Sequence, residues 1–144
     1  MNGPAGHVLV ADIGGTNARF ALADTSSATP LDAGSIGEYP VAQFASLADA
    51  AACYLRERGA RARGGVFAVA GRVDGDEARI TNHPWVISRS RTATQLGLSQ
   101  LHLINDFVAQ AMSVALLQPA DVVQTGGAAW QPAAPSLPRN YCVI

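Results

Sequence analysis

The chain has 144 residues, of which 49% are hydrophobic and 15% are charged, and its formal net charge is −1. This composition is typical of a single globular domain and excludes a disordered chain. The positive charge comes from scattered arginines, with no lysine and no basic cluster, so nucleic acid is not an expected partner. No apolar run reaches membrane-spanning length and the first seven residues lack a secretion signal's positive flank, so we expect a cytoplasmic protein without a membrane partner.

Apolar periodicity divides the chain into alternating strands and helices. In chain order, the pattern predicts strands at residues 7–13 and 19–23, a weaker strand at 35–39, a helix from residue 47 that ends at Gly59, strands at 65–70 and 78–81, a short helix at 92–96, a strand at 101–104 and a helix at 107–117. An alanine- and proline-rich connection at 128–138 leads to an apolar run at the last four residues. A strand near the C-terminus of a protein is normally followed by polar residues, and none follow here. We therefore expect this chain to be the N-terminal portion of a longer protein.

The first strand leads into a loop whose residue types suit the binding of phosphate. The loop reads Asp12-Ile13-Gly14-Gly15-Thr16-Asn17. Glycines allow backbone N–H groups to approach an anion closely, and the Thr16 hydroxyl and Asn17 amide can donate as well. Asp12 could hold Mg²⁺, through water, because this cation prefers carboxylates and keeps much of its hydration beside phosphates. Donors and a metal in this arrangement are what phosphoryl transfer requires.

The same loop has a simpler interpretation. A glycine pair between two strands is often only a hairpin turn, and an aspartate beside it is often only a turn former. The complete string is more demanding, because it places a carboxylate at the end of an apolar strand and a hydroxyl and an amide directly after the glycines. We therefore favour the phosphate site over the bare turn.

A second candidate site, Asn105-Asp106, lies where the strand at 101–104 passes into the helix at 107–117. A carboxylate at the carboxyl end of a strand can accept a proton from a hydroxyl nucleophile, which is the task of a general base in phosphoryl transfer. The alternative is that Asp106 caps the following helix, a common use of aspartate at that position. Both roles can be held by one side chain.

Three strings in this chain resemble segments of the bacterial glucokinases, in the same order and at the same spacing. They are ADIGGTNARFAL at residues 11–22, TNHPW at 81–85 and LINDFVAQA at 103–111. The first is similar to the family's first phosphate loop. The resemblance implies that this loop binds ATP phosphates with Mg²⁺ at Asp12, that Asn105 and Asp106 bind the sugar, and that Asp106 takes the proton from the sugar 6-hydroxyl.

The string at 81–85 is placed near the sugar cleft by the same resemblance. A loop tryptophan beside a proline is more often a packing anchor than a sugar platform, and we expect this of Trp85. His83 is expected to be a structural hydrogen-bonding residue rather than a base. Neither they nor Asn82 is predicted to be catalytic.

The resemblance also implies the fold, which is α/β, an actin-like or ribonuclease H-like ATPase domain with a mixed five-stranded sheet and flanking helices. Residues 1–114 would form the small N-terminal kinase domain and 115–144 the start of a second, large domain. The implied activity is ATP-dependent phosphorylation of glucose at the 6-hydroxyl, a step of glycolysis.

The family's later glycine-rich loop, further sugar-binding residues and much of the adenosine pocket lie beyond this chain, so we expect it to be inactive alone. Two alternatives stay open: a non-catalytic sugar- or nucleotide-sensing module, and a kinase for a different hexose or an acetamido sugar. An edge left by a missing second domain could also allow a homodimer.

Overall fold

The computed structural model describes residues 7–127. By their internal contacts the residues fall into two compact units, one ending at Asp106 and one beginning at Phe107, and each is described by itself. Within the described residues no helix is long and apolar enough to cross a membrane. The predicted connection at 128–138 and the apolar run at the last four residues lie outside the described residues.

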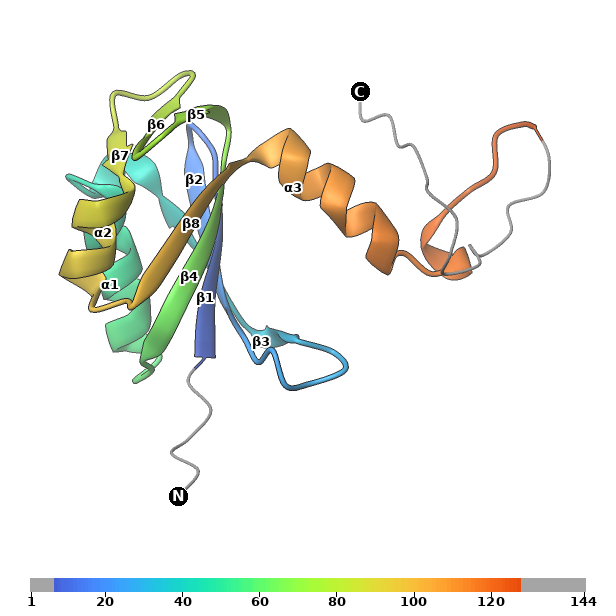
Figure 1. Cartoon of the computed structure of the whole chain (residues 1–144), viewed down its shortest axis with the longest axis horizontal. Coiled ribbons are helices and arrows are strands. Elements are labelled where there is room, and N and C mark those ends of the chain that lie inside the picture. The colour runs from blue at the N-terminus through green and yellow to red at the C-terminus, as the bar shows by residue number, and fades with distance from the viewer. Residues whose placement is uncertain (1–6, 128–144) are drawn as a thin grey trace. The chain divides into compact units, whose positions relative to one another are not determined.

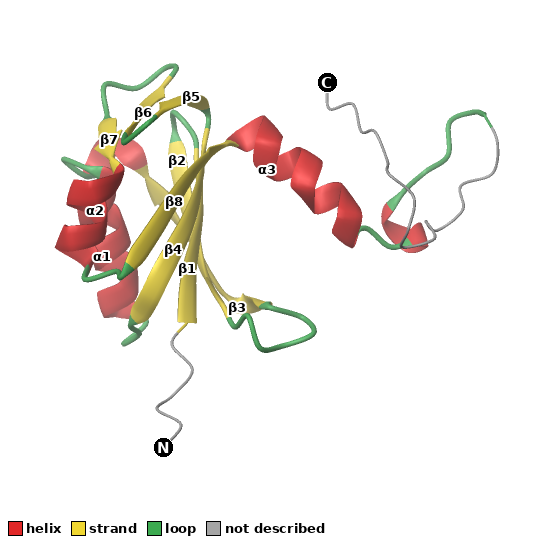
Figure 2. Cartoon of the chain, viewed as in Figure 1, coloured by secondary structure: helices red, strands yellow, loops and turns green. Residues whose placement is uncertain are grey.

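A five-stranded sheet forms the centre of the first unit (Figures 1 and 2). Its strands are β1 (His7–Ile13), β2 (Asn17–Ala23), β3 (Leu31–Pro40), β4 (Ala62–Val69) and β8 (Gln100–Asn105), in the order β3-β2-β1-β4-β8. The pairs β1–β2 and β2–β3 are antiparallel, whereas β1–β4 and β4–β8 are parallel. The prediction of a mixed five-stranded sheet is therefore confirmed, including the strand expected at 35–39.

A second, three-stranded sheet was not predicted. It consists of β5 (Gly71–Asp74), β6 (Glu77–Ile80) and β7 (Val86–Ser88), all antiparallel. Only β6 corresponds to a predicted strand. Strand β6 is no longer than β5, but its sequence Glu-Ala-Arg-Ile alternates polar and apolar residues, whereas Gly-Arg-Val-Asp of β5 and the three residues of β7 show no such pattern.

Two helices, α1 (Leu47–Glu57) and α2 (Arg89–Leu96), lie together on one face of the large sheet (Figure 2). The Ser46 hydroxyl accepts a hydrogen bond from the Asp49 N–H at 3.2 Å, which confirms the predicted start of α1. Helix α2 ends at Gly97, whose φ of 67° lies in the left-handed region that favours glycine. The core lies between helices and sheet, and its largest fully buried side chains are Leu9, Ile13, Phe20, Val41, Tyr54, Phe67 and Val69.

The helix predicted at 107–117 is shorter than expected. Helix α3 spans Asp106–Ser113, and short 3-10 turns follow at Val114–Leu116 and Pro119–Asp121. None of the residues of α3 is buried. The predicted domain boundary after residue 114 concerns a complete two-domain fold and stays a prediction.

Candidate active site

The three parallel strands of the large sheet end in register. Ile13 of β1 lies opposite Val69 of β4, which in turn lies opposite Asn105 of β8. The loop that follows β1, the junction that follows β4 and the Asn105-Asp106 pair therefore begin at one edge of the sheet. Carboxyl ends of parallel strands are where open α/β sheets bind ligands.

The loop between β1 and β2 contains hydrogen-bond donors that the described residues do not use. The Gly14 N–H donates to the Asn17 carbonyl at 2.9 Å, and the Thr16 carbonyl accepts from the Val41 N–H at 2.9 Å. Within residues 7–127, the N–H groups of Gly15 and Thr16, the Thr16 hydroxyl and the Asn17 side-chain amide have no hydrogen-bond partner. These groups can meet an anion, whereas the N–H of Gly14 is already occupied.

The two loop glycines are not required by the backbone conformation. Neither has a positive φ, although a tight two-residue hairpin turn would need one. A Cβ on Gly15 would make ordinary contacts, 3.4 Å from Cβ of Asn82, and a Cβ on Gly14 would lie 3.3 Å from the Asn17 carbonyl oxygen. Their lack of side chains keeps the backbone bare, which suits the close approach of a phosphate.

Asp12 stands at the end of β1, and its side chain is more than half exposed. One carboxylate oxygen, Oδ2, lies 3.4 Å from Nη1 of Arg19 on β2, and Nε of Arg19 donates to Glu38 on β3 at 2.9 Å. The carboxylate of Glu38 raises the pKa of Arg19. The Arg19 guanidinium is therefore held mainly by Glu38, and Asp12 keeps an exposed carboxylate at the strand end.

The donor set around Asp12 suits a hard cation that arrives with phosphate. Within the described part of the chain, no group of three or more His, Cys, Asp or Glu side chains comes together. Mg²⁺ is commonly bound by one or two carboxylates, with water and phosphate oxygens completing its octahedron. One accessible carboxylate beside a loop of anion donors fits this requirement.

Asn105 and Asp106 stand at the end of β8, and both are half-buried. The Asn105 amide donates through Nδ2 to the main-chain carbonyl of Gly71 at 2.9 Å. Helix α3 begins at Asp106 itself, one residue earlier than predicted, so Asp106 lies in the first turn instead of preceding it. A carboxylate is favourable in that position because it faces the positive end of the helix dipole.

The segment at 81–85 joins β6 to β7. Trp85 is 7% exposed and belongs to the core. Its main-chain N–H donates to Nδ1 of His83 at 3.3 Å. The two rings meet edge to face with centroids 4.9 Å apart. This geometry agrees with a packing role for Trp85 and a structural role for His83. Asn82 is exposed and lies against Gly15 of the loop after β1.

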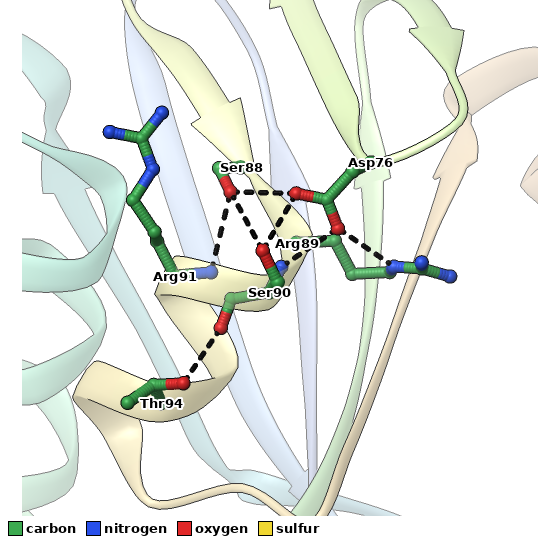
Figure 3. A network of polar contacts seen from close by, with 6 residues as sticks. All are labelled: Asp76, Ser88, Arg89, Ser90, Arg91 and Thr94. Carbon is green, nitrogen blue, oxygen red and sulfur yellow. Dashed lines mark hydrogen bonds and ion pairs between the residues drawn. The ribbon is translucent and has the colours of Figure 1, made fainter.

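Asp76 is a residue that the sequence did not single out (Figure 3). Its Oδ2 accepts from the hydroxyls of Ser88 and Ser90 at 2.8 Å each, and its Oδ1 accepts from the Ser90 N–H at 3.1 Å. Arg89 adds an ion pair through Nε at 3.3 Å. These bonds, those from Ser88 and Ser90 above all, lower the pKa of Asp76 to about 2. Asp76 thereby closes the base of the β6–β7 hairpin, whose loop carries residues 81–85.

The role of the dipeptide Ala70-Gly71, which joins β4 to the first residue of β5, was also not predicted. The Ala70 N–H donates to the Ile13 carbonyl at 2.9 Å, and the Ala70 carbonyl accepts from the Thr81 N–H at 3.1 Å. Gly71 in turn binds Asn105. These main-chain bonds link the loop after β1, the segment at 81–85 and the end of β8. The sequence signal that could have pointed to this dipeptide is the position of Gly71 shortly after an apolar strand.

The mixed five-stranded sheet, with a glycine loop after its first strand, has the sugar kinase fold. A solved glucokinase from an Antarctic psychrotroph is similar, with a TM-score of 0.70 and 34% identity over 79% of this chain and 36% of that one. A glucokinase from Balamuthia mandrillaris, solved in complex with glucose, has a TM-score of 0.53 and 26% identity over 76% of this chain and 32% of that one.

The Glucokinase family model matches residues 9–137, and the chain belongs to this family. It is 73% identical over 137 residues to a glucokinase of Stenotrophomonas maltophilia, a match that covers 95% of this chain and 41% of the relative. It is 67% identical over its whole length to a glucokinase of Xanthomonas campestris, of which it covers 43%. The chain thus spans about two fifths of the length of these curated relatives, and the resemblance seen in its sequence is confirmed.

Proposed function

We propose that this chain is the N-terminal part of an enzyme that transfers the γ-phosphate of ATP to the 6-hydroxyl of glucose. One observation carries the proposal: Ile13, Val69 and Asn105 end their strands in register, so a loop of unpaired donors and the Asn105-Asp106 pair begin at the same sheet edge. Membership of the glucokinase family supports the choice of reaction and sugar.

In this proposal the loop after β1 binds the nucleotide. The N–H groups of Gly15 and Thr16, the Thr16 hydroxyl and the Asn17 amide donate to phosphate oxygens, and the absence of Cβ atoms at Gly14 and Gly15 allows the phosphates to come close. The carboxylate of Asp12 orients a hydrated Mg²⁺. When bound, the ion would supply positive charge that offsets the negative charge of the phosphates.

Asn105 and Asp106 act on the acceptor. Asn105 binds a sugar hydroxyl. Asp106 accepts the proton of the sugar 6-hydroxyl while the oxygen of that hydroxyl forms a bond to the γ-phosphorus. The bond between that phosphorus and the bridging oxygen breaks, and ADP departs with the electron pair. Asp106 then passes its proton to solvent.

The test is to express the complete reading frame that encodes this chain and to measure ATP consumption against a panel of hexoses and acetamido sugars. Glucose should be the preferred acceptor. Asp106→Ala should lower kcat by about 10²–10⁴-fold, the usual contribution of a general base. Asp74→Ala is the matched control, because that exposed carboxylate forms an ion pair with Arg72 away from the proposed site.

Three outcomes would contradict parts of this proposal. Full activity in Asp106→Ala would remove Asp106 from the role of base. Preference for another sugar would keep the kinase and change its substrate. Binding of sugar or nucleotide without turnover would favour a sensing module. Residues 1–144 alone are expected to be inactive, and a cytoplasmic location and a homodimer belong to the proposal for the complete protein.

A further inference from the structure

A pocket with a volume of about 270 Å³ lies where helices α1 and α2 begin. Its wall is formed by the start of α1, the first two turns of α2 and the segment at 84–88, which contains β7. Neither the loop after β1 nor the end of β8 contributes to this wall, so the pocket is separate from the proposed phosphate and sugar sites. Ligand pockets usually measure about 300–1,000 Å³, so this one suits a small molecule.

The start of α1 supplies two main-chain donors. The Asp49 N–H donates to the Ser46 hydroxyl and the Ala50 N–H donates to the Ser46 carbonyl, both at 3.2 Å. Within residues 7–127, the N–H groups of Leu47 and Ala48 have no hydrogen-bond partner, and both residues line the pocket. These donors stand at the positive end of the helix dipole, which favours a negatively charged acceptor.

Thr92 on α2 gives an independent indication of a ligand. It lines the pocket and is only 5% exposed. Among the described residues its hydroxyl has no hydrogen-bond partner, whereas the Thr94 hydroxyl on the same helix donates to the Ser90 carbonyl. In this part of the chain no fully enclosed side-chain oxygen or nitrogen lacks a partner, so the Thr92 hydroxyl keeps some accessible surface, and the pocket is the space that Thr92 lines. Buried hydroxyls are normally bonded, so this one can serve a ligand.

Arg91 adds a positive charge to the pocket wall. Its main-chain N–H donates to the Ser88 hydroxyl at 3.3 Å, but its side chain is directed away from Asp76 (Figure 3). The guanidinium has no ion pair or hydrogen bond with any residue that the structure describes. A guanidinium is well suited to a carboxylate, which it can bind through two parallel N–H donors.

The carboxylate of Asp49, in the first turn of α1, limits the charge of the ligand. Its Oδ2 accepts from the Ser46 hydroxyl at 2.6 Å, and its Oδ1 accepts from the amide of Gln95, a residue of the pocket wall, at 3.1 Å. This negative charge repels an anion nearby, and it repels a phosphate dianion more than a carboxylate. The wall also includes Trp85 and Ile87, which present apolar surface. A single carboxylate on a short apolar body matches these features.

We propose that the pocket binds a small organic acid. The carboxylate of this acid accepts hydrogen bonds from the N–H groups of Leu47 and Ala48 and from the Thr92 hydroxyl. Arg91 pairs with its charge, and Trp85 contacts its apolar body. The proposal goes beyond the proposed function and does not depend on it, because the phosphate loop and the Asn105-Asp106 pair take no part.

The test uses benzoate as the probe and the protein from the complete reading frame, with binding followed by an NMR titration. Benzoate should bind saturably, and benzyl alcohol and inorganic phosphate should each bind at least tenfold more weakly. Thr92→Val keeps the shape of the side chain and removes the hydroxyl, and Arg91→Gln removes the charge. Each should raise the Kd for benzoate by about tenfold, which corresponds to the loss of one hydrogen bond to a charged group.

Two control variants separate binding from folding. Thr92→Ser retains the hydroxyl and should keep the Kd for benzoate within twofold of that of the unsubstituted protein. Arg56→Gln changes an exposed arginine in the last turn of α1, at the opposite end of that helix, and should leave the Kd unchanged.

The proposal would be overturned by the absence of saturable benzoate binding or by an unchanged Kd in both Thr92→Val and Arg91→Gln. Equal affinity for benzyl alcohol would also overturn it, because the pocket would then recognise the ring and not the carboxylate. Tighter binding of phosphate would contradict the limit that we assign to Asp49. None of these measurements requires phosphoryl transfer, so the pocket can be confirmed or lost whatever the outcome for the proposed kinase.

Discussion

The body of the large sheet and its carboxyl edge are held together in different ways. In the body, fully buried side chains from β1, β2 and β4 share one core cluster with residues of α1, and the ring of Phe20 packs against the rings of Tyr54 and Phe67. At the edge, exposed polar groups are kept in place by main-chain bonds through Ala70-Gly71. The body should therefore determine stability and the edge should determine binding.

The sharpest test of this difference is Phe20→Ala. Loss of a fully buried aromatic ring leaves a cavity, and we expect the free energy of unfolding to fall by about 3–5 kcal/mol. Phe107→Ala is the matched control, because that ring is 54% exposed and its loss should cost far less. Urea denaturation followed by circular dichroism measures both. Equal losses in the two variants would contradict the assignment of the core.

A smaller loss is expected where the backbone needs glycine. Gly97 ends α2 with a φ of 67°, so Gly97→Ala should cost about 1 kcal/mol, the penalty for a side chain in the left-handed region. Gly34→Ala is the control, since Gly34 is exposed on β3 and has no positive φ. The same denaturation experiment applies, and a neutral Gly97→Ala would show that α2 can end in another conformation.

The Asp76 network predicts a stability difference that depends on pH. The pKa of Asp76 is lowered to about 2, so its carboxylate stabilises the fold above the ordinary aspartate pKa and loses this effect as the pH falls toward 2. Asp76→Asn should therefore lower the melting temperature most near neutral pH, and the difference should shrink between about pH 4 and pH 2. Asp74→Asn, on the exposed neighbouring carboxylate, is the control. A difference that does not change with pH would contradict the role of the charge.

The smallest effect on stability is expected at the edge. Gly15 has no positive φ and a Cβ there makes only ordinary contacts, so Gly15→Ala should change the free energy of unfolding by no more than about 0.5 kcal/mol. The same methyl group lies where we propose that phosphates approach. We therefore expect at least a tenfold rise in the KM for ATP in the complete protein. If Gly15→Ala lowered the free energy of unfolding and left the KM for ATP unchanged, the edge would determine stability and not binding, contrary to our expectation.

The body of the sheet was also the part that the sequence predicted best. Runs of apolar residues predicted the strands β1, β2, β4 and β8, and the helix predicted from residue 47 to Gly59 corresponds to α1. Strands β5 and β7 were not predicted because neither has a clear alternating pattern. No role was predicted for Gly71, because its contact with Asn105 depends on the register between β4 and β8. Hydrogen bonds between distant segments have no local pattern from which they could be predicted.

The sequence suggested residues for the candidate site but not the contacts that connect them. Asp12 and the Asn105-Asp106 pair were selected from residue type and from their expected place at strand ends; the structure places them there, and their roles stay predictions. Asp76 was not selected, because a carboxylate that binds the start of a helix through Ser88 and Ser90 resembles an ordinary turn residue in the sequence. The phosphate site was favoured over a bare turn for the glycine pair, and neither glycine has the positive φ that would have tied it to a turn; its role in binding stays a prediction.

The parallel register of β1, β4 and β8 also has a consequence for the order of folding. The β1–β2 hairpin closes over a few residues and can form early, whereas the parallel pairs require long segments to be ordered before their contacts form. The row Ile13, Val69 and Asn105 is complete only when both parallel pairs have formed. Ligand binding at this edge would then report the last step of folding, and a chain that had only collapsed around its hairpin would have a core and no site.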